Sequence, residues 1–263
     1  MKRKMDAPRL YAFQAGGDVA DVAISDPFDP EVGKKEFSPW FVYVVVHPEG
    51  NVLFDTGIHP QMVTDPRSRL GAFADLLEAR MKPGDDIVSQ LASIGLEPHD
   101  ISVVVASHLH FDHVDALELF RHARIVVQRS EYAFAHNPAV YQSGAYVPSA
   151  FAGEFEWQLI GGPLDVFDDG LIELIPTPGH TPGHQSMLVN LAGGKVLVLG
   201  DVTYQMDKMR ERLLPAILWN PEAMVASWEL IEWLSKREDA VMLCSHDREF
   251  ESRVRLGPGS WYE

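Results

Sequence analysis

The sequence has few of the residues on which disulfide bonds and membrane spans depend. It contains one cysteine, Cys244, so no internal disulfide bond can form. Its apolar runs, such as residues 41–46, fall far short of the roughly 18 residues that a membrane span needs. The basic residues at the start are not followed by the apolar segment of a secretory signal. We therefore expect a cytoplasmic protein that does not interact with a membrane.

Positive charge is also scarce. The 22 Lys and Arg residues are outnumbered by 38 Asp and Glu residues, which gives a formal net charge of −16. A surface this acidic repels phosphate backbones and anionic lipid headgroups, so nucleic acid is not an expected partner. The sequence also lacks the GlyXSerXGly turn that carries a nucleophilic serine, which disfavours serine-based hydrolysis.

What is present is a series of short strand-like runs with few helical segments between them. An amphipathic helix is predicted over 85–96, where Gly95 supplies the stop, and another over 221–236, where Asn220 is the cap and Pro221 the first residue. The predicted strands are 9–14, 41–46, 51–55, 102–107 and 124–129 in the first half, and 156–160, 171–175, 185–191, 195–201 and 240–245 in the second.

Two strand-rich halves, each followed by helices, indicate two mixed sheets packed face to face. No linker rich in Gly, Ser or Pro separates them, so residues 1–263 are expected to form a single domain. The predicted fold class is α/β (α+β), an αββα four-layer sandwich with the helices on the outer faces. The irregular segment 59–84, with a helical patch at about 70–81, is predicted to cover a substrate; a surface insertion or a dimer contact is the alternative.

The strongest chemical signal is the run SerHisLeuHisPheAspHis at 107–113, directly after the predicted buried strand 102–107. His108, His110, Asp112 and His113 would be costly polar groups beside an apolar strand unless an ion organised them. On extended backbone, His108 and His110 point to the same side, whereas Asp112 and His113 lie past the turn into the next helix. One short motif can therefore serve two adjacent metal ions.

Three further candidate ligands each follow a predicted strand. They are His180 in the turn 177–184, Asp201 at the end of strand 195–201, and His246 directly after strand 240–245. A catalytic metal site needs about three protein ligands and one open position, so the motif at 107–113 requires such partners. Because the ends of neighbouring strands meet at one edge of a sheet sandwich, we expect these three side chains to reach that motif.

The motif HisXHisXAspHis, followed in order by the later His, Asp and His, resembles the metallo-β-lactamase superfamily over nearly the whole chain. The resemblance implies two Zn²⁺ ions, with Co, Mn or Fe as other divalent choices, and a metal-bridging hydroxide as the nucleophile. It implies that one ion is held by His108, His110 and His180, that the second is held by Asp112, His113 and His246, and that Asp201 bridges both. Asp201 replaces the cysteine of typical dinuclear β-lactamases, and His110 replaces the glutamate of the diiron oxidoreductases.

A narrower resemblance is to the N-acyl-homoserine lactonases. It rests on residues 107–113, 125–132 and 180–186, and on Tyr204, which stands three positions after Asp201. It implies a small-molecule lactone substrate, a quorum-sensing signal, whose oxyanion accepts a hydrogen bond from Tyr204. Asp112 or Asp201 would then carry the proton, and a homodimer is compatible with the family. Where those lactonases commonly have AlaGlyGly, this chain has ValAspAla at 114–116, which brings the substrate's placement near Asp115 into question.

Acyl chains need an apolar groove, and the irregular segments offer a few candidates to line one. They are Phe28, Trp40, Met62, Phe73, Met206 and Trp219. The histidines outside the ligand pattern, such as His47, are expected to be ordinary surface residues. His184 is expected to support the site from behind at most, since Pro182 and Gly183 make its spacing from His180 a turn rather than a helix.

Other functions stay open at this point. The nearest is hydrolysis of another lactone or ester, as in the pyridoxolactone-type hydrolases, which share the metal and tyrosine positions. A thioesterase of the glyoxalase II kind is disfavoured because those enzymes carry a basic C-terminal helical domain, and this chain ends soon after His246. A mononuclear-iron persulfide dioxygenase is disfavoured by the complete second site with His113 and His246. A metal-stabilised binding protein would leave the open coordination positions idle.

Overall fold

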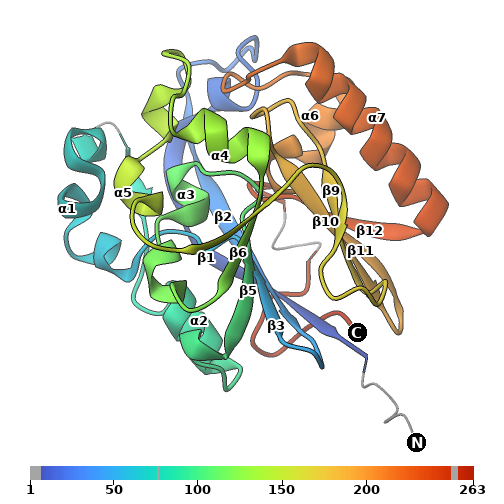
Figure 1. The fold of residues 1–263 in the computed structure, drawn as a ribbon. Coiled ribbons are helices and arrows are strands. Elements are labelled where there is room, and N and C mark those ends of the chain that lie inside the picture. Colours follow the sequence, from blue (N-terminus) through green and yellow to red (C-terminus); the bar gives the residue numbers. More distant parts are fainter. Residues whose placement is uncertain (1–6, 76, 250–253) are drawn as a thin grey trace, which may run out of the picture.

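In the computed structural model, which describes residues 7–75, 77–249 and 254–263, two mixed sheets lie face to face (Figure 1). The first sheet has the strand order β4-β1-β2-β3-β5-β6-β7 and the second β12-β11-β10-β9-β8. The strands of the first sheet are β1 (Arg9–Asp21), β2 (Lys35–Val46), β3 (Asn51–Phe54), β4 (Ala79–Arg80), β5 (Ile101–Val105), β6 (Arg124–Gln128) and β7 (Glu156–Ile160). Those of the second are β8 (Leu164–Asp165), β9 (Ile172–Pro176), β10 (Gln185–Leu191), β11 (Gly194–Val198) and β12 (Ala240–Leu243).

Helices cover the outer face of each sheet (Figure 1). The helices beside the first sheet are α1 (Pro66–Leu70), α2 (Ile87–Ser93), α3 (Phe111–Val114), α4 (Arg129–Ala135) and α5 (Pro148–Phe151); those beside the second are α6 (Met206–Glu211) and α7 (Pro221–Glu238). Within the described residues, no helix combines the length and apolar character that crossing a membrane requires.

The layers follow from the alternation of side chains along each strand. In β2, Tyr43 and Val45 belong to the apolar cluster between the two sheets, whereas Val42 and Val44 belong to the cluster beneath the helices of the first sheet. In β11, Val196 faces the centre and Leu197 packs toward α6 and α7. Because neighbouring strand residues point to opposite faces, both faces of each sheet are apolar and buried. The predicted αββα sandwich is confirmed.

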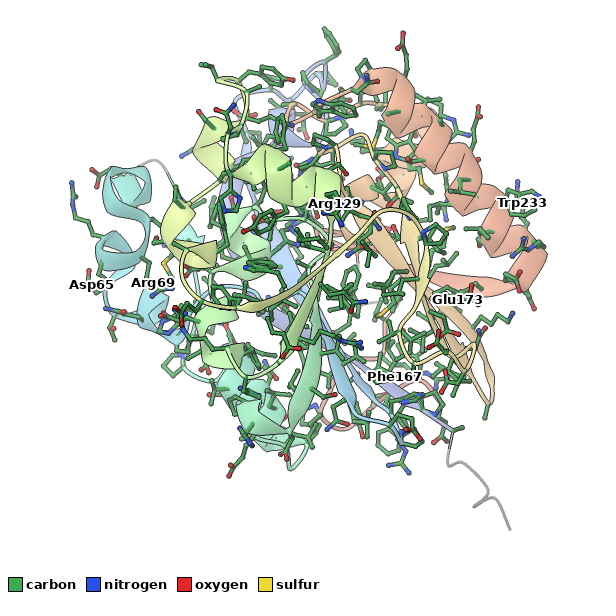
Figure 2. All side chains as sticks on the ribbon, in the orientation of Figure 1. Asp65, Arg69, Arg129, Phe167, Glu173 and Trp233 are labelled. Atoms are coloured by element: carbon green, nitrogen blue, oxygen red, sulfur yellow. The ribbon has the colours of Figure 1, made fainter. Side chains whose placement is uncertain are left out.

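The long helix α7 forms as its sequence predicts. The Asn220 side chain accepts a hydrogen bond from the Ala223 N–H at 2.9 Å, and Pro221 occupies the first turn, where no N–H is needed. Trp228 and Ile231 are buried against the second sheet, while Trp233 points outward (Figure 2). The predicted helix 85–96 also forms, although α2 is shorter.

Some predictions about the sheets and the irregular segment were wrong. β7, predicted with the second half, pairs in parallel with β6 and closes the first sheet. The helical patch predicted at 70–81 is displaced: α1 and a 3-10 helix span 66–75, and Ala79 and Arg80 form β4 on the edge strand β1. Ala79 and Arg80 pair with residues 17 and 18 of β1, and the periodicity of apolar residues within a short segment cannot predict such a distant pairing.

β1 is longer than predicted, and its extension positions residues near the functional site. The strand runs past a register shift between Gln14 and Gly17 and continues pairing with β2 as far as Asp21. The extension carries Asp18 to the wall of a cavity described below. His47, expected on the surface, is instead buried, with Nε2 3.0 Å from an Asp169 carboxylate oxygen and its ring stacked on Phe167.

Candidate metal centre

The 107–113 segment places its candidate ligands on a loop and on a short helix. β5 ends at Val105, the chain bends at Ser107, and His110, with an extended φ of −69° and ψ of 152°, is the N-cap residue of α3. Asp112 and His113 then lie in the short helix α3. The motif therefore presents two histidines from the loop after β5 and an Asp–His pair from a helical turn.

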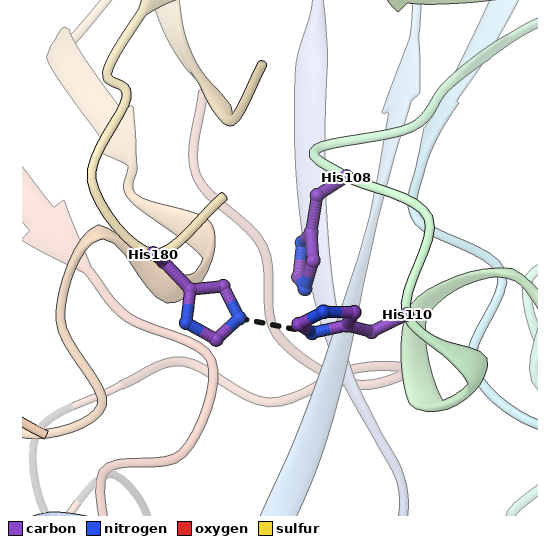
Figure 3. A group of neighbouring side chains, drawn as sticks. All are labelled: His108, His110 and His180. Carbon is purple, nitrogen blue, oxygen red and sulfur yellow. Dashed lines mark hydrogen bonds between the residues drawn. The ribbon is translucent and has the colours of Figure 1, made fainter. Parts of the chain in front are cut away.

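The first group of side chains consists of His108, His110 and His180, all of which are buried. Each offers a ring nitrogen, and these nitrogens lie within 4.8 Å of one another. Figure 3 shows the three rings converging from two loops. Nε2 of His180 lies 3.0 Å from Nδ1 of His110. Two ring nitrogens at this separation can share a proton in a hydrogen bond or bind the same metal ion.

The second group consists of Asp112, His113 and His246, and Asp201 lies between the two groups. Oδ1 of Asp201 is 3.1 Å from Nε2 of His246 and 3.3 Å from Nε2 of His113. Its other oxygen, Oδ2, is 3.5 Å from Nε2 of His180. One carboxylate thus reaches both groups, which is the geometry of a bridging ligand.

Hydrogen bonds behind the rings fix their orientation. Nδ1–H of His180 donates to the Ile217 carbonyl at 2.9 Å, and Nδ1–H of His246 donates to the Pro39 carbonyl at 3.0 Å. With Nδ1 bound in this way, Nε2 of each ring is left facing the centre. A partner on the far nitrogen is the usual arrangement for a metal-binding histidine, since it fixes the tautomer and the ring plane.

Asp55 performs the same task for His113 and was not singled out from the sequence. Its Oδ2 lies 2.7 Å from Nδ1 of His113, and its two oxygens accept hydrogen bonds from the backbone N–H and the hydroxyl of Ser107. Burial raises the pKa of Asp55 against the opposing effects of His113 and Ser107. The sequence feature that could have identified Asp55 is its position at the end of predicted strand 51–55, which lies beside strand 102–107 in the sheet.

His184 holds the backbone of the bridging aspartate rather than facing the centre. Its Nε2 accepts the Asp201 N–H at 2.9 Å, while Nδ1 lies 2.9 Å from the Thr177 hydroxyl oxygen. Burial lowers the pKa of His184 to about 3, so the ring is neutral and can accept. Gly200 allows this approach, because a Cβ at its φ of +59° would lie 2.7 Å from Nε2 of His184. The prediction of a supporting role at most is consistent with these contacts.

The charges within the two groups suit divalent cations. Burial, reinforced by the neighbouring histidines, holds the pKa of His108 and His110 well below the usual range, so both rings are neutral. For Asp201, burial raises the pKa, but His246 and His113 outweigh that effect and bring it well below its usual value. Burial lowers the pKa of His113 and His246, but Asp201 and Asp112 outweigh that effect and raise the pKa of both rings above its usual value, so a bound cation would replace a proton there. Imidazole nitrogens around an ionised carboxylate are the donor set that zinc and related ions prefer.

Several polar atoms at this centre lack a hydrogen bond within the described chain. Nε2 of His108 and His113 and Oδ1 of Asp201 are buried and make no hydrogen bond of ordinary geometry there, although Oδ1 lies 3.3 Å from Nε2 of His113 and 3.1 Å from Nε2 of His246. Burying such atoms unpaired costs free energy that a bound cation would recover. The residues present therefore fit a dinuclear metal centre, and all seven ligand candidates from the sequence lie in it.

A cavity of about 500 Å³ opens onto this centre. Tyr204, predicted as a catalytic residue, lines it, with its ring 5.6 Å from the His180 ring and 5.1 Å from the His246 ring. Its hydroxyl makes no hydrogen bond to the described residues. Burial and then the carboxylates of Asp201 and Asp112 raise the pKa of Tyr204 well above its usual value, so the phenol is a hydrogen-bond donor.

The apolar lining of the cavity differs from the predicted groove. Of the predicted residues, Trp40 lines it, and Met62 packs behind Trp40 in the same apolar cluster. Phe28 is 91% exposed, Met206 packs beneath α7, Trp219 is not in the lining, and the Phe73 side chain lies outside the described part of the chain. Apolar lining residues that the sequence analysis missed are Ile24, Leu77, Phe111, Tyr141 and Ile217.

Comparison with known proteins places this centre in a family. Residues 38–246 match the model of the metallo-beta-lactamase superfamily. The chain belongs to that superfamily. Within it, the chain is 32% identical to the N-acyl homoserine lactonase AttM of Rhizobium radiobacter, over 95% of this chain and 97% of that protein. It is 30% identical to the N-acyl homoserine lactonase AiiA of Bacillus thuringiensis subsp. kurstaki, over 97% of this chain and 99% of that protein.

Solved structures agree with this placement in the metallo-beta-lactamase superfamily. An N-acyl homoserine lactone hydrolase, determined with the product N-hexanoyl-L-homoserine at its catalytic metal centre, has a TM-score of 0.85 and 28% identity, covering 97% of this chain and 98% of that one. AidC, a dizinc quorum-quenching lactonase, shares the fold at a TM-score of 0.67 and 16% identity, covering 93% of this chain and 90% of that one. Both resemblances read from the sequence are confirmed.

Asp115, where this metallo-beta-lactamase chain departs from the AlaGlyGly of the lactonases, binds the irregular segment instead of lining the cavity. Its carboxylate is fully buried and accepts from the His59 N–H at 3.0 Å and from Nη2 of Arg69 at 3.1 Å. Arg69 lies on α1, within the segment 59–84 (Figure 2). The same segment brings Leu77 and Glu78 to the cavity wall. Asp115 thus anchors one wall of the cavity to α3, next to the metal centre.

Replacing Arg69 by methionine should loosen this wall. The substitution leaves a buried carboxylate without its cation, and breaking a buried pair typically costs about 3–5 kcal/mol. We expect a fall toward that size in the free energy of unfolding, together with faster tryptic cleavage within residues 59–84. Both are measured by denaturant unfolding and limited proteolysis.

The control is Arg67→Met. Arg67 pairs with Asp75, and both side chains are largely exposed. Removing an exposed pair changes stability by about 0–1 kcal/mol. Equal effects of the two substitutions would contradict the anchoring role of Arg69.

Proposed function

We propose that the protein is a dinuclear zinc hydrolase that opens the lactone ring of N-acyl-homoserine lactones and so degrades quorum-sensing signals. The observation that carries this proposal is the seven-residue cluster from His108 to His246, which borders a cavity that Tyr204 also lines. The AttM and AiiA relatives, which bear the name N-acyl homoserine lactonase and match nearly the full chain, support the choice of substrate.

In this proposal each geometric group would hold one ion. His108, His110 and His180 would hold the first and Asp112, His113 and His246 the second, and Asp201, which lies within 3.5 Å of ring nitrogens in both groups, would contribute to both. When bound, a pair of such ions lowers the pKa of a water molecule and polarises the carbonyl that it attacks. Zinc is the choice that the imidazole and carboxylate donors favour, with other divalent metals as substitutes.

The chain's own residues supply orientation and proton transfer. Tyr204 donates its free hydroxyl proton as a hydrogen bond to the lactone oxygen on which charge develops, and a donor placed this way stabilises the transition state. Asp112 lines the cavity and is the more accessible of the two carboxylates, with 16% of its side chain exposed against 3% for Asp201. It is therefore placed to accept the proton of the attacking water and return it to the departing alkoxide.

The walls of the cavity favour a neutral substrate with an apolar tail. Trp40, Leu77 and Ile217 supply apolar surface that an acyl chain can cover. Besides the proposed ligands Asp112 and Asp201, the described lining includes the carboxylate-bearing residues Asp18, Asp21 and Glu78, together with Lys35. This balance disfavours anionic thioesters and phosphodiesters, because negative charges in a cavity repel them.

The test is ring opening of N-acyl-homoserine lactones of several chain lengths by zinc-loaded protein, followed as proton release. Pyridoxolactone and a glutathione thioester serve as competing substrates, and chelator-treated protein serves as the blank. We expect the homoserine lactones to be the fastest substrates and the treated protein to be inactive. If pyridoxolactone alone were hydrolysed, the substrate would be another lactone. If protein carrying two ions hydrolysed none of these compounds, an enzymatic role would be refuted.

A further inference from the structure

Glu131 is a buried carboxylate that lies between the two loops carrying the first group of ligands. It is the third residue of α4 and has no exposed surface. It coordinates nothing in the proposed site, and its side chain is turned toward backbone. A carboxylate so deeply buried needs several hydrogen bonds to offset its desolvation.

Two of these bonds come from backbone groups next to metal-ligand candidates. The N–H of Leu109, between His108 and His110, donates to Oε1 of Glu131 at 3.0 Å. The N–H of Gly183, in the loop that begins with His180, donates to Oε2 at 3.2 Å. One side chain thus joins two segments that are far apart in the sequence.

The Gly183 loop touches α4 so closely that a side chain would not fit there. A Cβ at Gly183 would lie 2.2 Å from the Glu131 backbone nitrogen and 2.5 Å from its Cβ. The absence of a side chain at Gly183 therefore permits the loop to approach α4 closely, and the hydrogen bond to Glu131 fixes the position of the loop along the helix. Both features restrict where His180 can lie.

A third hydrogen bond to Glu131 comes from Tyr146, whose ring packs against His110. The Tyr146 hydroxyl donates to Oε1 of Glu131 at 2.9 Å, and the Tyr146 ring packs edge-on against the His110 ring at 4.6 Å between centroids. Glu131 accordingly constrains His110 through the neighbouring backbone and through a packed aromatic ring.

We propose that Glu131 is a positioning residue for one half of the centre, the half formed by His108, His110 and His180, and that it sets the affinity of that half for its metal ion. The inference rests on the proposed function only in that the centre holds two ions. Asp55 is hydrogen-bonded directly to His113 in the other half, and it also reaches His108 through the Ser107 hydroxyl. Glu131 would thus support one metal position, whereas Asp55 contacts ligand candidates of both.

The test compares Glu131→Gln, Glu131→Ala and Asp55→Asn by the number and affinity of bound zinc ions. In Glu131→Gln one oxygen becomes an NH₂ group, so whichever way the amide turns, one of the two backbone N–H donors loses its acceptor. Replacing groups that orient metal ligands typically lowers affinity by about 10–100-fold. We expect a loss in this range for one of two ions in Glu131→Gln and a larger loss in Glu131→Ala.

Double variants assign the weakened position. Glu131→Ala combined with His180→Ala should bind one ion, as His180→Ala does alone, because both changes affect the same half. Glu131→Ala combined with His246→Ala should lose both ions. Asp55→Asn should weaken both positions, because Asp55 contacts His113 directly and His108 through Ser107. Hydrogen exchange of the Leu109 and Gly183 amides in metal-free protein supplies a readout without metal, with faster exchange expected in both Glu131 variants.

Three results would overturn the inference: wild-type zinc affinity in both Glu131 variants, equal weakening of both ions, or unchanged exchange at Leu109 and Gly183. Circular dichroism of the metal-free variants, recorded below their melting temperatures, ensures that folded protein is compared. Lactone hydrolysis is not used in these measurements. Selective metal loss with no lactonase activity would therefore refute the proposed function and leave the role of Glu131 intact.

Discussion

Replacing Asp201 by alanine should lower kcat/KM for lactone hydrolysis about 10³-fold or more and reduce the bound metal. Among the residues that the structure describes, Asp201 is the one carboxylate within 3.5 Å of ring nitrogens in both groups of ligand candidates. Metal ions contribute several kcal/mol of transition-state stabilisation, and each 1.36 kcal/mol corresponds to a factor of ten in rate. Steady-state kinetics on a homoserine lactone, with metal content measured on the same samples, tests this expectation.

A matched control comes from a buried aspartate that serves the fold. Asp86 caps α2 through the Ser89 N–H at 2.9 Å and lies outside the cavity lining. Asparagine caps helices as well as aspartate does, so Asp86→Asn should keep both metal ions and the wild-type rate. Asp201→Ala protein with two ions and an unchanged rate would contradict the bridging role of Asp201.

Tyr204→Phe should lower kcat about 10²–10³-fold with a smaller effect on KM and no loss of metal. The phenol makes no hydrogen bond to the described residues, so its removal leaves no protein group unpaired and should change stability little. A donor aimed at a developing oxyanion is worth 10²–10³ in kcat when other donors remain. The measurement is a comparison of kcat, KM and metal content between the variant and the wild type.

Tyr132→Phe is the appropriate control for this substitution. The Tyr132 ring packs against Trp157 and His136, away from the residues that line the cavity. Its kinetics should match those of the wild type. If the Tyr204→Phe enzyme had a normal kcat, the Tyr204 hydroxyl would have no role in catalysis, and the ring would serve only to pack against His180 and His246.

The sequence by itself predicts the candidate ligand set, because these residues are marked by local patterns. His108 and His110 follow an apolar strand at the spacing that places both on one side of extended chain, and Asp201 and His246 each follow a strand-like run. Burial of strand faces and capping of α7 by Asn220 are likewise properties of short segments. Such features depend on neighbours within a few residues, so periodicity and capping rules detect them.

Tertiary structure alone decided how the ligands are supported. Asp55 and His113 are 58 residues apart, Glu131 and Gly183 are 52 apart, and Arg69 and Asp115 are 46 apart. The pairing of β7 with β6, and of β4 with β1, was also beyond local patterns. The sequence around an Asp or Glu residue does not show which hydrogen-bond donors its buried carboxylate will contact, because chain packing brings those donors close to it. The candidate ligands of this centre are therefore marked by local patterns, whereas the hydrogen bonds that orient them exist only once the loops at the strand ends have been brought together.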